Sequence, residues 1–219
     1  SAHRQRAMCR PGATALMPVY ARDILQVGAE GLGQMRAAPA VGAATVAILL
    51  ALWPLKHNVG AKMLWSVVVF GLATIGFGLS YEIAARLFNN ASWSIYAGES
   101  LGTLTLSSAM WIALIMLVIL GAADMLSVYV RSSLVQLNTP DAMRGRVSSI
   151  SGLAISASNE LGELQSGFAA ALLGPVGAVV AGGAGAIMVT GLWTWLFPEL
   201  KNAKTFEPQF RDPAKETPT

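Results

Sequence analysis

Residues 131–147 read RSSLVQLNTPDAMRGRV, a basic stretch with one proline that separates two long apolar runs. The run before it, residues 104–130, reads LTLSSAMWIALIMLVILGAADMLSVYV, and the next run begins at Val147. A helix needs about 20 mostly apolar residues to cross a bilayer. A charged connector between two runs of that length is typical of a multi-pass membrane protein, so this stretch indicates the fold class.

The composition of the whole chain favours the same class. Hydrophobic residues make up 54% of the sequence and charged residues 12%, against about 25% charged residues in an average soluble domain. The single cysteine, Cys9, excludes an intrachain disulfide, and both histidines, His3 and His57, lie outside the apolar runs. The sequence carries no phosphate-binding GxxxxGK motif. We therefore predict no enzyme, no metal site, no cofactor and no nucleic-acid partner.

The apolar runs predict an all-α membrane protein with five full transmembrane helices and a partial one. The full runs cover residues 37–55, 63–81, 104–130, 147–173 and 175–197, and the partial run covers residues 11–21. Residues 1–10 are basic and polar where apolar residues are expected, so we interpret them as truncated or non-native. Residues 201–219 are polar and rich in proline, which predicts a disordered tail.

The distribution of lysine and arginine predicts the orientation in the membrane. Cytoplasmic connectors carry an excess of basic residues. Basic residues gather at Lys56 and Lys62, in the 131–147 connector and in the tail, whereas those on the opposite side are offset by acids. We therefore expect a multi-pass protein of the plasma (inner) membrane of a bacterium, with its carboxyl terminus in the cytoplasm.

The fourth full run, residues 147–173, is the most polar. Its small and polar residues recur at spacings of three and four, which places them along one helical face. Because lipid cannot satisfy such groups, this face must contact other helices or a water-filled cavity. The stripe consists of Ser149, Gly152, Ser156, Asn159, Glu163 and Ser166, with Glu160 beside it.

Two interpretations of this stripe remain open. A carboxyl group at membrane depth is costly to ionise and favours its protonated form. That property suits proton coupling, or a substrate cavity, formed by Ser156, Asn159, Glu160 and Glu163. The alternative is a structural polar contact between helices.

Asp124 also carries a charge inside an apolar run, within two turns of its cytoplasmic end. Its candidate partners are Arg131, Arg144 and Arg146. Such a pair would fasten neighbouring helix ends in one conformation and release them in another, which is a cytoplasmic gate. Simple neutralisation of a charge at a helix end is the alternative.

Small residues recur every four positions in the last run, at Gly177, Ala181 and Gly185. Such a stripe allows helices to approach closely in lipid, so it predicts a packing contact.

Three segments together resemble a known family. They are GAADM at residues 121–125, the 131–147 connector, and ASNELGELQSG at residues 157–167. They are similar to the carboxyl-terminal half of major facilitator superfamily transporters, in the enterobactin-exporter-like or transmembrane secretion effector branch. Residues 18–43 resemble the end of that branch's seventh helix and its connector, and the likeness covers about residues 11–200.

This resemblance implies a fold and a function. Such transporters have two six-helix bundles, with substrate bound between them near mid-membrane. The chain would supply helices seven, in part, to twelve, and its partners would be the bilayer, an amino-terminal six-helix half and a small-molecule substrate. Proton-coupled efflux of a drug, siderophore or metabolite is then expected. The alternative is a stand-alone half-bundle that assembles with a separately encoded membrane partner and transports nothing alone.

Overall fold

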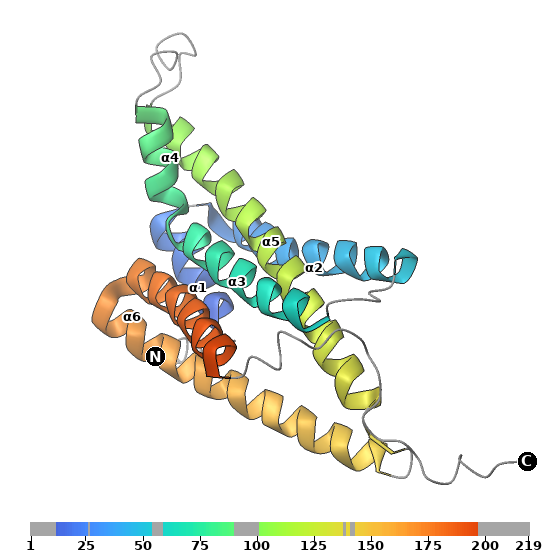
Figure 1. The fold of residues 1–219 in the computed structure, drawn as a ribbon. Coiled ribbons are helices and arrows are strands. Elements are labelled where there is room, and N and C mark those ends of the chain that lie inside the picture. The colour runs from blue at the N-terminus through green and yellow to red at the C-terminus, as the bar shows by residue number, and fades with distance from the viewer. Residues whose placement is uncertain are drawn as a thin grey trace, which may run out of the picture.

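The computed structural model describes residues 12–25, 27–53, 59–89, 101–137, 139–140 and 143–196. Their secondary structure is helical, with no strand in these ranges. The elements in chain order are α1 (Gly12–Val19), the π-helical turn η1 (Tyr20–Ile24), α2 (Gly28–Leu52), α3 (Val59–Gly78), α4 (Ser80–Asn89), α5 (Leu101–Leu137) and α6 (Arg144–Leu196) (Figure 1).

Within the described ranges, four helices are long and apolar enough to cross a membrane: α2, α3, α5 and α6. The prediction of an all-α chain with several membrane-length helices is therefore confirmed for this part of the chain. The segments interpreted as truncated or non-native, residues 1–10, and as a disordered tail, residues 201–219, lie outside the described residues.

The longest helix, α6, bends sharply at Gly174. This residue has a φ of 75°, in the left-handed region that favours glycine. Pro175 follows, and proline suits the first turn of a helix because it has no N–H to satisfy there. The bend divides α6 into a first arm, residues 144–173, and a second arm, residues 175–196, and Figure 1 shows the chain doubling back between them. The bend lies between the two apolar runs predicted for this region.

Helix α5 is the centre of the packing. It contacts α2, α3 and α4, while α3 also packs against α6, and α1 packs against α6. The short α1–η1 segment, predicted as a partial span, contributes heavily to the core. The Tyr20 hydroxyl donates a hydrogen bond to the Gly78 carbonyl oxygen at 3.0 Å, and its ring lies 4.7 Å from that of Phe77. The largest fully buried side chains include Met17, Tyr20, Leu25, Met35, Phe77 and Leu117.

Two glycines set the crossing of α2 and α5. A Cβ atom on Gly42 would overlap the carbonyl oxygen of Val118, and one on Gly121 would overlap the carbonyl oxygen of Pro39. The two backbones therefore touch directly, as small residues allow in membrane helix pairs.

A second glycine pair joins α3 to the second arm of α6. A Cβ atom on Gly183 would lie 2.7 Å from the Gly71 carbonyl oxygen. The predicted stripe does not make this contact: Gly185 has open space around it, Ala181 is exposed, and Gly177 would meet only Leu173 of its own helix. The contact with α3 is therefore made by a glycine outside the predicted stripe, because glycine or alanine occurs on every face of the second arm.

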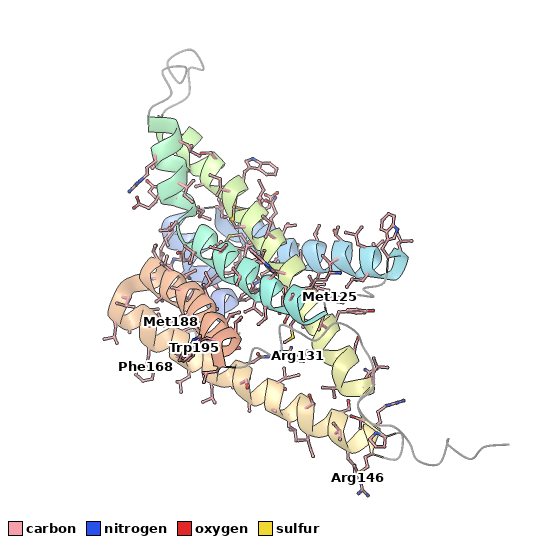
Figure 2. The ribbon with its side chains drawn as sticks, in the orientation of Figure 1. Met125, Arg131, Arg146, Phe168, Met188 and Trp195 are labelled. Atoms are coloured by element: carbon pink, nitrogen blue, oxygen red, sulfur yellow. The ribbon has the colours of Figure 1, made fainter. Side chains whose placement is uncertain are left out.

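Large apolar side chains cover much of the outer surface. Met188 and Trp195 of the second arm are 74% and 80% exposed, and Trp53 at the end of α2 is 73% exposed. Figure 2 shows such side chains projecting from the helices. A large exposed apolar surface is a membrane or partner surface rather than a water-facing one.

Candidate functional site

The first arm of α6 has two chemically different faces. Its apolar face consists of large side chains that are 61% to 82% exposed: Ile150, Leu153, Leu161, Leu164, Phe168 and Leu172. Figure 2 shows Phe168 on the side of the arm turned away from the other helices. The predicted polar stripe occupies the opposite side, since its positions fall about half a turn from these. We call Gly152, Ser156, Asn159, Glu163 and Ser166 the polar face.

The end of the polar face nearest the Gly174 bend is turned toward the rest of the bundle, whereas Gly152, Ser156 and Asn159 are exposed. Glu163 and Ser166 are half-buried although most of the first arm is exposed. Ala170, one turn beyond Ser166 on the same face, packs against the hydrophobic core. At the other end of the face, Gly152 lines a cavity shared with α5.

The residues predicted for proton coupling or substrate binding differ in exposure. Ser156, Asn159 and Glu160 are exposed, whereas Glu163 is half-buried. Ser166 donates a hydrogen bond to the Gly162 carbonyl oxygen at 2.7 Å, so its hydroxyl is satisfied within its own helix. Glu163 is therefore the acid of this face that lies deepest in the bundle.

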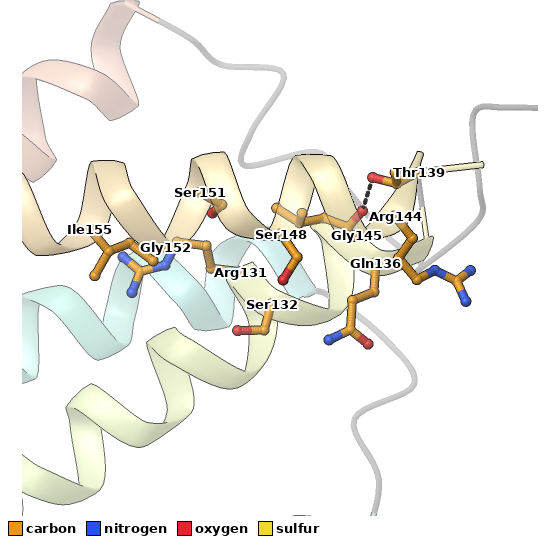
Figure 3. A pocket seen from close by; sticks show the side chains of 11 residues that line it. Arg131, Ser132, Gln136, Thr139, Arg144, Gly145, Ser148, Ser151, Gly152 and Ile155 are labelled. Atoms are coloured by element: carbon orange, nitrogen blue, oxygen red, sulfur yellow. Dashed lines mark hydrogen bonds between the residues drawn. The ribbon is translucent and has the colours of Figure 1, made fainter. Parts of the chain in front are cut away.

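The cavity, of about 590 Å³, lies between the end of α5 and the start of α6 (Figure 3). Arg131 extends from α5 toward the part of α6 that carries Gly152 and Ile155. Arg144 lies at the opposite end of the residues that line the cavity. We call this space the arginine cavity. The described residues that line it are Arg131, Ser132, Val135, Gln136, Thr139, Arg144, Gly145, Ser148, Ser151, Gly152 and Ile155.

The arginine cavity brings together two of the four residues predicted as a cytoplasmic gate. Arg131 and Arg144 line it, but Asp124 and Arg146 are not among its described lining residues. Asp124 and Arg131 share one face of α5, about 10 Å apart along the axis because seven residues separate them. No ion pair joins these two side chains. Arg146 lies at the outer end of the first arm, well away from Met125, the neighbour of Asp124 (Figure 2).

The residues of the arginine cavity that sequence analysis missed are mostly hydroxyls and an amide. Ser132 and Gln136 lie on the same side of α5, and Ser148 and Ser151 lie near Gly152 on α6. The sequence signal for these residues is their helical spacing on the two sides of the connector: Ser132 and Gln136 are four residues apart, and Ser148 and Ser151 are three residues apart.

The described residues contain no group of three histidine, cysteine, aspartate or glutamate side chains that could hold a metal ion. A comparison with protein-family models, curated proteins and solved structures finds no match to this chain.

Proposed function

We propose that the chain is one half of a membrane carrier that exports a small molecule and is driven by the proton gradient. The observation that carries the proposal is the two-faced first arm of α6. A helix exposing leucine and phenylalanine on one side and carrying serine, asparagine and glutamate on the other separates lipid from a polar path.

The polar face needs a covering partner. Ser156 and Asn159 are exposed on a helix of membrane length, and lipid cannot satisfy their polar groups. A second bundle placed against this face would bury these groups or enclose a water-filled path between the two halves. In the major facilitator architecture that the sequence resembles, an amino-terminal six-helix half occupies this place. The proposal thus includes five full spans and a partial one in this chain.

Proton coupling is assigned to Glu163. It is the half-buried carboxyl group on the polar face, while Glu160 lies at the edge of that face and is exposed. A carboxyl group held away from bulk water can release its proton when the path opens to one side and regain it when the path opens to the other. The bacterial inner membrane, with a cytoplasmic carboxyl terminus, supplies the gradient for this cycle.

Reconstituted vesicles test this function. The chain, joined to the six-span segment expected to precede it, is placed in liposomes with an imposed proton gradient. A panel of an intercalating dye, a lipophilic cation and a catecholate siderophore is then offered. We expect gradient-dependent movement of at least one compound, and none with this chain alone. Movement by the chain alone, or no movement by the joined halves, would contradict the proposal.

A further inference from the structure

We propose that the arginine cavity binds a phosphate group presented at the cytoplasmic surface of the membrane. This site adjoins the polar face at Gly152, but its occupancy does not require that the chain transport anything. It depends only on the helices spanning the bilayer in the predicted orientation.

The lining chemistry suits a phosphate. Arg131 comes from α5 and Arg144 from α6, and the two arginines lie toward opposite ends of the cavity (Figure 3). Guanidinium groups donate paired hydrogen bonds that match phosphate oxygens. Among the described lining residues none is acidic, and the acid of the connector, Asp141, lies outside the described residues.

Further hydrogen-bond donors line the same cavity. Ser132 and Gln136 from α5 and Ser148 and Ser151 from α6 line the same space. Hydroxyl and amide groups donate to phosphate oxygens without adding negative charge. The remaining walls include Val135 and Ile155, which are apolar.

The size and position of the arginine cavity also suit a lipid headgroup. Its volume of about 590 Å³ exceeds the need of a bare phosphate ion and falls in the range of about 300–1,000 Å³ typical of small-molecule sites. The charge asymmetry of the sequence puts these helix ends at the cytoplasmic leaflet, where anionic lipids concentrate. Basic pockets between membrane helices on that side bind acidic headgroups. A phosphodiester headgroup and a soluble phosphate share the chemistry that Arg131 would recognise.

Lipid binding to the full chain provides the test. Phosphatidylglycerol and the zwitterionic phosphatidylcholine are titrated separately into detergent-solubilised protein, and bound lipid is counted by native mass spectrometry. We expect Arg131→Gln to weaken phosphatidylglycerol binding about tenfold, the order expected for losing one charged hydrogen bond. Arg146→Gln changes an exposed arginine two residues after Arg144 that is not among the described lining residues, and this variant should bind as the wild type does.

A second pair of variants fills the space without removing a charge. Gly152 lines the arginine cavity and Gly167 does not, yet a Cβ atom at either position would meet nothing within 4 Å. Gly152→Leu should therefore reduce lipid binding while Gly167→Leu should not, and both should fold. This pair keeps the test valid if Arg131→Gln lowers the yield of folded protein.

Binding of inorganic phosphate, measured against chloride at equal ionic strength, distinguishes a soluble phosphate from a lipid headgroup as the ligand. Phosphatidylglycerol binding that depends on Arg131 and Gly152 assigns the site to a lipid headgroup. Phosphate binding that depends on them, without such lipid binding, assigns it to a soluble phosphate. The proposal is overturned if neither Arg131→Gln nor Gly152→Leu changes the binding of phosphatidylglycerol or of phosphate. It is also overturned if Arg146→Gln weakens binding as much as Arg131→Gln does.

Discussion

Replacing Gly121 by leucine is expected to abolish the folded bundle. Even a Cβ atom at this position would overlap the Pro39 carbonyl oxygen, and Gly42 meets the α5 backbone in the same crossing. Overpacking a core typically costs about 1–3 kcal/mol and occasionally more, and here the obstacle is backbone that cannot rotate away. Since α5 is the helix that joins α2, α3 and α4, separating α2 from it opens the core.

The measurement is the yield of monodisperse protein after detergent extraction, together with its thermal unfolding. Gly33→Leu is the matched control, because Gly33 lies on α2, is exposed, and has nothing within 4 Å of its Cβ position. We expect the control to behave as the wild type does. A Gly121→Leu variant with wild-type yield and unfolding temperature would show that α2 and α5 do not cross in this way.

Replacing Glu163 by glutamine is expected to eliminate proton-driven transport by the joined halves. Glutamine keeps the size of the side chain and its capacity for hydrogen bonds but cannot exchange a proton. Transport driven by a pH gradient should fall to the level of vesicles without protein, while yield and unfolding temperature stay close to those of the wild type. Glu82→Gln, which changes an exposed acid on α4 away from the polar face, should leave transport intact.

The same variant distinguishes coupling from a structural role. If Glu163 serves as a polar contact between helices, Glu163→Gln should lower the unfolding temperature and the amount of folded protein together with transport. Unchanged transport in a folded variant would remove Glu163 from the coupling mechanism.

The sequence predicts an all-α chain with several membrane-length helices, as the described residues show, because length and hydropathy alone identify a membrane helix. The expected boundary between residues 173 and 175 lies at the Gly174 bend, since a glycine followed by a proline ends one helix and begins another. The polar face was also predictable, because its period matches that of a helix.

Other features depend on how helices meet, which periodicity does not specify. Gly183, rather than the stripe of Gly177, Ala181 and Gly185, contacts α3, because glycine and alanine occur on several faces of the second arm. The position of the predicted gate residues depends on the same geometry, because the direction of the first arm of α6 places Arg146 well away from Met125, the neighbour of Asp124 (Figure 2). The arginine cavity forms only where the ends of α5 and α6 come together.

We infer that the polar face of α6 borders a water-accessible path while the apolar face borders lipid. Cysteine labelling in intact membranes tests it directly. Cys9, the single native cysteine, is replaced by serine, and cysteines are then placed singly at Ser156 and Asn159 on the polar face and at Leu153 and Leu161 on the apolar face. We predict that a charged maleimide labels the polar-face cysteines in the joined halves and leaves the apolar-face cysteines unmodified. Equal labelling of both faces, or labelling confined to Leu153→Cys and Leu161→Cys, would contradict the account.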